Sequence, residues 1–227
     1  AIDLLRKTDE AADTLANLRD ADTREITIAV HRDVAAYMLP PQLAAFAARY
    51  PKTRVVTRIG TIEDVVAMLR DREVHLGLFL ASGPIAGLPS DELAREPMVM
   101  VACPDHPLAR RQTVTAAALD GIAIVTGLRQ SRYAKMVDSA LANIGVTNYD
   151  VVMELQESSA VKEMVRHGAG VACLPQCTVR AEIAAGALVV LALSVPLAEL
   201  ELRCAYRAPL SVIGQHMVHC LGQPAKC

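Results

Sequence analysis

The chain has 227 residues, of which 52% are hydrophobic and 21% are charged, and its formal net charge is −2. This length can bury one large core or the cores of two small lobes. The charge balance does not supply the clustered Lys and Arg that hold nucleic-acid phosphates, and the few aromatic residues (3%) argue against a base-stacking surface. No stretch approaches the ~20 apolar residues of a membrane span. Composition therefore disfavours direct nucleic-acid binding and membrane insertion.

Residues 1–22 are predicted to form one helix with a coiled-coil seam. The spacing of a coiled-coil seam, alternating steps of three and four, is followed by Ala1, Leu4, Thr8, Ala11, Leu15 and Leu18. About two to three heptads with a Thr among them make a weak seam that needs help from neighbouring contacts. The chain begins with Ala and lacks the basic and apolar regions of a secretory leader, so we expect a fragment of a cytoplasmic protein.

One order of elements occurs twice along the rest of the chain. In the first half, alternating and apolar runs predict strands at 26–30, 54–59 and 75–80, with helices at 40–48 and 62–70 between them. In the second half, the same patterns predict strands at 122–125, 151–155, 171–174 and 188–193, with helices at 132–143, 158–167 and 179–185. Gly168 and Gly170 are expected to end a helix and turn the chain into a strand, the reverse of the order in a dinucleotide-binding fingerprint.

Strands that alternate with short helices predict parallel sheets built from right-handed crossovers. The repetition predicts two Rossmann-like α/β lobes, the first formed by residues 23–100 and 200–227 and the second by residues 101–199. Apolar runs at 98–103 and 200–207 are expected to carry the chain between the lobes, and helix 211–221 to return to the first lobe. Such a pair of lobes binds its ligand in the cleft between them, near strand carboxyl ends and helix N-termini.

Five motifs occur in the order found in a known family. The first runs through residues 26–30, 39–46 and 50–51, and the second joins Gly60 to residues 65–69 and 74–78. Residues 103–109 contain an "hPLA" pattern, residues 165–175 a "V-x-x-G-x-G-h-x-x-L-P" pattern, and residues 185–188 its usual sequel. Together they resemble the effector-binding domain of LysR-type transcription regulators. Within that family, residues 155–162 are similar to the regulators of carbon-fixation operons.

The resemblance implies a type 2 periplasmic-binding-protein-like fold that follows a linker helix, and a role as a sensor rather than an enzyme, without a cofactor. It also implies a small effector in the cleft, self-association into a dimer or tetramer, and DNA contact only through a winged helix-turn-helix domain missing from this chain. We expect the effector to be anionic. Residues 65–69 and the last helix, with Val212, Ile213 and Val218, are expected to supply the dimer surface.

In the first lobe, His31, Arg32 and Asp33 follow the first predicted strand, where family members often carry Ser or Thr. The Arg32 guanidinium suits a carboxylate or phosphate, although a solvated loop in which Arg32 pairs with Asp33 explains the same residues. Gly60 and Thr61 end the second strand. Thr61 is a helix-cap residue in a helix-cap position, and a helix N-terminus also attracts anions.

In the second lobe, the candidate ligand-binding residues lie in the loops after the first two strands: Thr126, Gly127, Arg129, Arg132, Gln156, Ser158 and Ser159. Arg129 and Arg132 are candidates to clamp an anion opposite Arg32, and each is equally well explained as an exposed surface residue. Gln156 can bind a polar edge of a ligand. Ser158 and Ser159 are expected to cap the following helix, to bind the anion, or to do both.

Three other functions stay open. A secreted solute-binding protein would share the two lobes, although residues 1–20 are too polar and acidic for a leader. A thiol redox switch would use some of the six cysteines: Cys103, Cys173, Cys177, Cys204, Cys220 and Cys227. We expect Cys173 and Cys177 to be reduced and unbonded, because a bridge between them needs a cramped turn. An enzyme on this fold has no nucleophile motif to support it, and zinc needs more ligands than His216, His219 and Cys220 provide.

Overall fold

The computed structural model describes residues 25–222, so the linker helix predicted for residues 1–22 lies outside the described part. The chain divides into two compact units. Among the described residues, unit 1 contains residues 25–79, Pro84–Ala94 and residues 202–222, and unit 2 contains Leu80–Gly83 and Arg95–Glu201. The division thus falls near residues 95 and 202, where the sequence analysis places it near 100 and 200.

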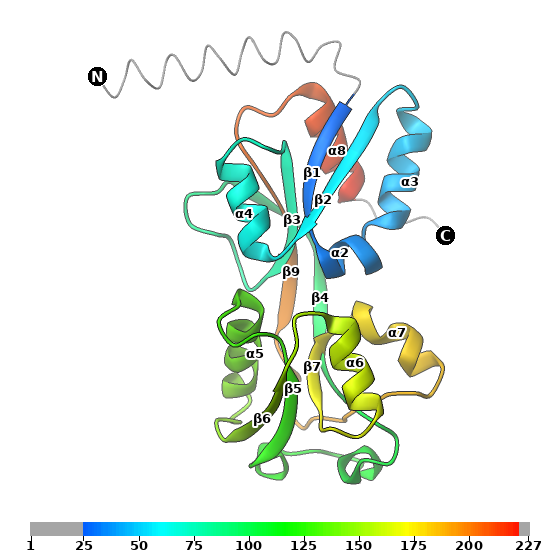
Figure 1. Ribbon diagram of the computed structural model, residues 1–227, viewed down its shortest axis with the longest axis vertical. Helices are drawn as coiled ribbons and strands as arrows, with labels where there is room; N and C mark the ends of the chain where they lie inside the picture. The colour runs from blue at the N-terminus through cyan, green and yellow to red at the C-terminus, as the bar shows by residue number, and fades with distance from the viewer. Residues whose placement is uncertain (1–24, 223–227) are drawn as a thin grey trace, which may run out of the picture. The chain divides into compact units, whose positions relative to one another are not determined.

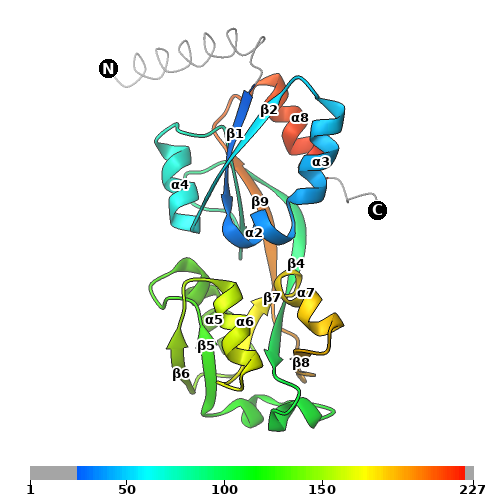
Figure 2. The ribbon, with the colours of Figure 1, turned by 45° about the vertical axis from the view of Figure 1, so that its right-hand side comes forward.

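Unit 1 is built on a parallel sheet with β1 (Glu25–His31) at its centre. β1 pairs with β2 (Arg54–Gly60) on one side and with β3 (Leu76–Ala81) on the other. The helices are α2 (Arg32–Tyr37), α3 (Pro40–Arg49), α4 (Ile62–Arg70) and α8 (Val212–Leu221). In Figures 1 and 2, α4 lies on one side of the sheet and α3 with α8 on the other. The sheet is therefore apolar on both faces, which explains the continuous apolar sequence of β1 and β3.

Unit 2 contains the parallel pair β5 (Ile122–Thr126) and β6 (Tyr149–Glu154). The strand β7 (Ala172–Pro175) is antiparallel to β4 (Ser90–Ala102), which also pairs with β8 (Val189–Val190). The helices are α5 (Arg132–Asn143), α6 (Ser158–Arg166) and α7 (Gln176–Ala184), with short 3-10 helices η1 (Pro107–Arg110) and η2 (Ala116–Leu119). A buried cluster that includes Val125, Val161, Val165, Leu174 and Val179 joins α6 and α7 to the strands.

Two long strands, β4 and β9 (Glu199–Tyr206), carry the chain from one unit to the other. β4 begins at Ser90, eight residues before the predicted run at 98–103. The prediction began too late because the first half of β4 is polar and is held by pairing with β9, not by an apolar pattern. Arg203 of β9 donates from its Nε to the Ser90 hydroxyl at 3.0 Å. The predicted strand at 188–193 is wrong in length, since only Val189 and Val190 form a strand, and Leu193 makes an isolated bridge with Val114.

The helix α4 packs closely on β3 because Gly77 has no side chain. A Cβ atom at Gly77 would lie 2.4 Å from Leu69 Cδ1 and 2.8 Å from Val65 Cγ1. Val65, Val66 and Leu69 are accordingly buried within unit 1. Ala67 of this run stays exposed and Met68 half-buried, so the expectation that the run supplies a dimer surface stays a prediction.

The turn from α6 into β7 requires glycine at Gly170. This residue has φ of +146°, and a Cβ there would lie 2.4 Å from the Ala123 carbonyl oxygen of β5. The close approach follows from the hydrogen bond that the next amide, Val171 N–H, donates to the same Ala123 oxygen at 2.9 Å. The predicted role of residues 168–170, a helix end with a tight turn, is confirmed by φ of +80° at Gly168.

The start of α4 is fixed by a capping box between Thr61 and Asp64. The Asp64 amide donates to Thr61 Oγ1 at 3.1 Å, while Thr61 N–H and its hydroxyl each donate to Asp64 Oδ2 at 2.8 Å. The backbone N–H and then the hydroxyl of Thr61 lower the pKa of Asp64, assisted by the positive charge of Arg32. The N-terminus of α4 therefore holds a carboxylate of its own.

We expect Gly170→Ala to lower the free energy of unfolding by about 2–4 kcal/mol, because the new methyl group meets backbone rather than a movable side chain. Gly186→Ala is the matched control: Gly186 also has a positive φ, of +68°, but nothing lies within 4 Å of its Cβ position. Its cost should be about 1–2 kcal/mol, the strain of the left-handed backbone alone. Urea unfolding measures both values, and equal losses would contradict the packing explanation.

The capping box predicts a pH-dependent loss of stability in Asp64→Asn. Because the pKa of Asp64 is lower in the folded chain, its contribution is fully present above the unfolded value of about 3.9 and is lost as pH falls through the folded value. The difference in unfolding free energy between parent and variant should thus be constant near neutral pH and shrink below about pH 4. Thr61→Ala should cost about 1 kcal/mol, and the double variant less than the sum of the two. A difference that is unchanged down to acid pH would contradict the assignment.

Candidate functional site

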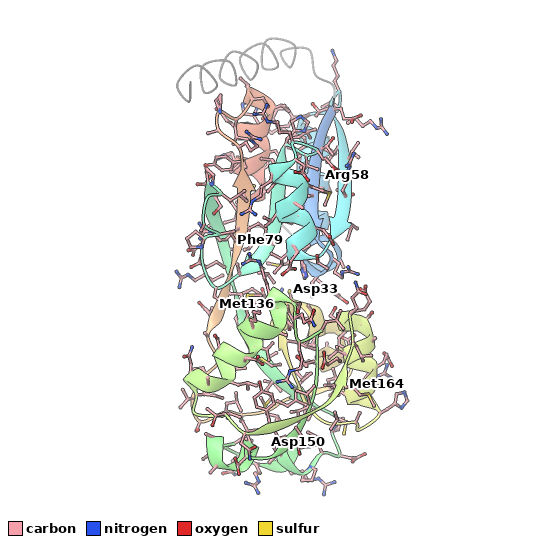
Figure 3. The ribbon with its side chains drawn as sticks, turned by 60° about the vertical axis from the view of Figure 1, so that its left-hand side comes forward. Asp33, Arg58, Phe79, Met136, Asp150 and Met164 are labelled. Atoms are coloured by element: carbon pink, nitrogen blue, oxygen red, sulfur yellow. The ribbon has the colours of Figure 1, made fainter. Side chains whose placement is uncertain are left out.

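In unit 1, the register of β1 and β2 brings the predicted residues of the first lobe together. His31 pairs opposite Gly60, so Arg32 and Asp33 lie beside Thr61 at the same edge of the sheet. Arg32 and Asp33 are not in a loop, as the sequence analysis allowed, but begin the short helix α2, with His31 at its N-cap position. Figure 3 labels Asp33 at this end of the sheet and Arg58 farther back along β2. Asp33 is buried, and Arg32 is half-buried.

The N-terminus of α4 is less suited to an anion than its sequence suggests. The capping box places the Asp64 carboxylate against the Thr61 amide and hydroxyl, which are the groups that an anion would use. Gly60 belongs to the same structure, because a Cβ there would lie 2.7 Å from Asp64 Cβ. The capping of α4 therefore accounts for Gly60 and Thr61 without a ligand. A second negative charge at this point would be repelled by Asp64.

In unit 2, the loops that follow β5 and β6 lie next to each other. Thr126 pairs opposite Glu154, and Leu155 N–H donates to the Thr126 carbonyl at 2.9 Å. The Arg129 amide donates to Glu154 Oε2 at 2.9 Å, which ties the first loop to the end of β6. Figure 3 labels Asp150 at the opposite, amino end of β6. The structure thus brings the Thr126–Arg129 segment and the Gln156–Ser159 segment to one edge of unit 2.

The exposure of these side chains differs. Thr126 is buried, Gly127 and Ser158 are half-buried, and Arg129, Arg132, Gln156 and Ser159 are exposed. Gly127 lies against the ring of Tyr133, whose Cδ1 would be 3.2 Å from a Cβ at Gly127. The Tyr133 hydroxyl in turn donates to the Cys173 carbonyl at 2.9 Å. The loop backbone is therefore held by a fixed aromatic side chain, while the arginines stay accessible.

Three helices of unit 2 begin at this edge, and they differ in whether a side chain accepts a hydrogen bond from the amides of the first turn. The Ser131 hydroxyl caps α5 by accepting from the Ala134 amide at 3.1 Å. The buried Glu96 carboxylate accepts from the Cys177 amide in the first turn of α7. The N-cap of α6, Glu157, makes no side-chain hydrogen bond to the helix, and its first turn contains no acidic residue.

Helix α6 begins at Ser158 with Glu157 as its N-cap, so Ser158 and Ser159 are its first two residues and neither of them occupies the N-cap position. Their hydroxyls and amides consequently lie at the positive end of the helix, which favours anions.

Two buried charged residues, neither of them predicted from the sequence, hold these helices in place. Lys162 of α6 has a side chain only 7% exposed, and its Nζ lies 2.6 Å from Glu182 Oε1 and 2.7 Å from the Thr178 carbonyl of α7. Figures 1 and 2 show α6 and α7 side by side. Glu96 of β4 is likewise buried, with Arg180 at 3.6 Å. Lys162 was detectable as a lysine one turn after Ser158 beside Val161 and Val165, but nothing in the polar run around Glu96 marks it.

The remaining predicted features lie outside this cluster. Cys173 and Cys177 are free thiols, as predicted, and burial raises the pKa of Cys173 to about 12, which disfavours the reactive thiolate. His216 stacks on Tyr50 with ring centroids 5.2 Å apart. Across residues 25–222, no three His, Cys, Asp or Glu side chains are placed to hold a metal ion. None of the helices in that same span has the length and apolarity needed to cross a membrane.

Comparison with known proteins identifies the family of this fold. The model of the LysR substrate binding domain matches residues 19–212. The chain is similar to the uncharacterized HTH-type transcriptional regulator YeiE of Escherichia coli K12, with 28% identity over 187 residues, 82% of this chain and 63% of that protein. It is also similar to the HTH-type transcriptional regulator CbbR of Xanthobacter flavus, with 27% identity over 189 residues, 83% of this chain and 56% of that protein. The chain thus spans 63% and 56% of the length of these two relatives.

Among solved structures, the chain is similar to the regulatory domain of CcmR from Synechocystis PCC6803 in complex with 2-PG. The TM-score is 0.79 and the identity 25%, covering 89% of this chain and 97% of that one. The predicted fold, a type 2 periplasmic-binding-protein-like pair of α/β lobes, is therefore confirmed, as is the predicted family, whose members are effector-binding regulatory domains and not enzymes. The chain belongs to the family of LysR substrate-binding domains, the regulatory domains of LysR-type transcription regulators.

Proposed function

We propose that this domain senses a small anionic metabolite, which binds at the edge of unit 2 where α6 begins. The observation that carries the proposal is the N-terminus of α6: its N-cap side chain leaves the first turn uncapped, and Ser158 and Ser159 occupy its first two positions. Amides and hydroxyls at the start of a helix bind anions without any further cation. The neighbouring first turns of α5 and α7 already hold Ser131 and Glu96.

Two arginines of the adjacent loop support an anionic ligand. Arg129 is exposed, and its backbone is tied to Glu154, so its position relative to β6 is fixed while its side chain stays accessible. Arg132 is the first residue of α5, where a positive charge opposes the helix dipole. Such a placement costs stability rather than adding it, which is consistent with a role in binding. Glu154 and Glu157 are nearby carboxylates with the same sign of charge as the proposed ligand. Glu154 already accepts a hydrogen bond from the Arg129 amide.

We assign unit 1 a smaller part in binding. Arg32 is the only cation among its predicted contacts, and its charge is partly used by Asp64, whose pKa it helps to lower. Asp33 is a buried carboxylate in the same first turn and would repel an anion. His31, Gly60 and Thr61 remain proposed contacts through the position of the strand ends. Gln156 and Thr126 in unit 2 are proposed to bind polar groups of the ligand.

For the whole protein, we propose that effector binding shifts an equilibrium between two arrangements of a dimer or tetramer, and so changes promoter binding by a separate helix-turn-helix domain. A ligand acts in this way only through its different affinities for the two arrangements. The similarity to HTH-type regulators supports this scheme, and the negative net charge of the present chain agrees with DNA contacts made elsewhere. The cytoplasmic location expected from the sequence stays a prediction.

The resemblance of residues 155–162 to carbon-fixation regulators, together with the similarity to CbbR and CcmR, sets the first compound to test. The CcmR regulatory domain is known in complex with 2-PG. We propose 2-PG and compounds of similar size as the first candidates for this chain, followed by a library of small anionic metabolites. A compound that binds only the folded domain raises its melting temperature by mass action, so thermal shift is a suitable screen.

The best compound from the screen should bind Arg129→Ala and Ser158→Ala about ten- to a hundredfold more weakly than the parent, because each variant loses a charge-assisted contact. Arg32→Ala should have a smaller effect, and none of the three should change stability much, since these side chains bury little surface. Arg110→Ala is the matched control, as its side chain is 79% exposed and lies 3.9 Å from Asp105, remote in sequence from the proposed contacts. Calorimetric titration measures the affinities. If all variants bind like the parent, an anion at this edge of unit 2 is ruled out.

A further inference from the structure

Unit 1 contains a cavity that the proposed effector site does not use. Its volume is about 350 Å³, and three segments line it: Leu69 and Arg70 at the end of α4, the residues 87–89 that precede β4, and the residues 206–208, which begin with the last residue of β9. The cavity lies at the C-terminal end of α4, whereas His31, Gly60 and Thr61 lie at its N-terminal end. A volume of this size is in the range of small-molecule sites, about 300–1,000 Å³.

The cavity has an apolar floor. Its exposed apolar lining is Pro89 and Ala208, while Leu69 is fully buried and Leu88 only 7% exposed. The ring of Tyr206 also lines the cavity, and its hydroxyl donates to Asp91 Oδ2 at 3.1 Å. Burial and then this bond to Asp91 raise the pKa of Tyr206, so the side chain stays neutral near pH 7. The floor thus offers an apolar surface with one aromatic wall that is held in position.

Two guanidinium groups line the same cavity. Arg70 is the last residue of α4, and Arg207 follows β9 and donates from Nη1 to the Arg70 carbonyl at 3.5 Å. Neither arginine forms an ion pair with a carboxylate anywhere in residues 25–222, and the nearby Asp91 already accepts the Tyr206 hydroxyl. The negative end of the α4 dipole favours cations at this point. A guanidinium carries five donors in a planar fork, so both arginines keep donors for a ligand.

We propose that this cavity is a second ligand site, which takes a small carboxylate with a compact apolar body. The carboxylate pairs with Arg70 and Arg207, and the apolar body covers Pro89, Ala208 and the ring of Tyr206. An inorganic anion would satisfy the arginines but leave this apolar lining in water, and a neutral apolar molecule would leave the guanidinium groups without a counter-charge. The combination therefore selects a molecule that has both parts.

The position of the cavity gives such a ligand a consequence for the fold. Residues 87–89 lead directly into β4, and residues 206–208 lead directly out of β9. A ligand that contacts both segments and the end of α4 links the two long crossing strands to a helix of unit 1. The site is separate from the proposed anion site at α6, so the two proposals succeed or fail independently.

The test is an amide NMR titration of the whole chain with phenylacetate, using phenylacetamide as the neutral analogue of the same shape. We expect saturable shifts at Gly87, Leu88 and Arg207 with phenylacetate, and at least about tenfold weaker binding of phenylacetamide. Absence of saturable shifts at these amides up to about 10 mM phenylacetate would overturn the proposal. Equal binding of the two compounds would overturn it as well, because the arginines would then have no role.

Arg70→Gln and Arg207→Gln should each weaken phenylacetate binding about tenfold or more, while the exposed Arg110→Gln, in unit 2, should leave it unchanged. The amide spectrum of each variant reports whether it is folded, so loss of binding is not mistaken for loss of structure. If both arginine variants bind like the parent, or if Arg110→Gln weakens binding as much as they do, the assignment of the carboxylate to Arg70 and Arg207 is wrong.

Discussion

The parallel register of neighbouring strands is the constraint on which the rest of this structure depends. Because β1 and β2 are parallel, and β5 and β6 are parallel, both strands of each pair end at one edge, and the following helices must begin there. The register places His31 opposite Gly60 in unit 1 and Thr126 opposite Glu154 in unit 2. Loops that are about 30 residues apart in sequence are thereby brought within contact, and helix N-termini face the same region.

The helices that begin at these edges differ in whether the chain itself supplies a negative charge to their N-termini. At α4, the capping box of Thr61 and Asp64 supplies the negative charge that a helix N-terminus favours, and at α7 the buried Glu96 does the same. At α6 the chain supplies serines instead, and it fixes the helix by other means, through the buried ion pair of Lys162 with Glu182. Removal of one partner of such a pair typically costs about 3–5 kcal/mol, so this pair helps to hold α6, whose N-cap side chain makes no bond to the helix. A helix start that carries no acidic residue suits the anion that we propose.

Much of this fold can be predicted from sequence where the signal is local. Helices α4 and α5 begin and end at the predicted residues, because a cap residue precedes each apolar pattern and a charged or polar residue ends it. The polar half of β4 was missed, since Ser90–Pro97 is held by pairing with β9 and carries no apolar run. The helix α2 was also missed, because its six residues follow β1 without a break. The candidate residues lie at the strand ends, as the sequence indicates, and their roles are the proposal made above. The spacing of Thr61 and Asp64 is typical of a capping box and could have been recognised in the sequence. The contact of Glu96 with the first turn of α7 could not, because it joins residues that are 81 positions apart.

The central claim, that the backbone at the start of α6 binds the anion, is tested most directly by Ser158→Pro. Proline is favoured at the first position of a helix and removes only the amide hydrogen there, and the extended backbone of Glu157 (φ −108°, ψ 130°) is compatible with a following proline. Comparison with Ser158→Ala then separates the amide from the hydroxyl. We predict that Ser158→Pro unfolds at the same urea concentration as Ser158→Ala but binds the best anion from the screen at least about tenfold more weakly, by calorimetry. Equal affinities of the two variants would contradict the account, because the amide at the N-terminus of α6 would then contribute nothing to binding.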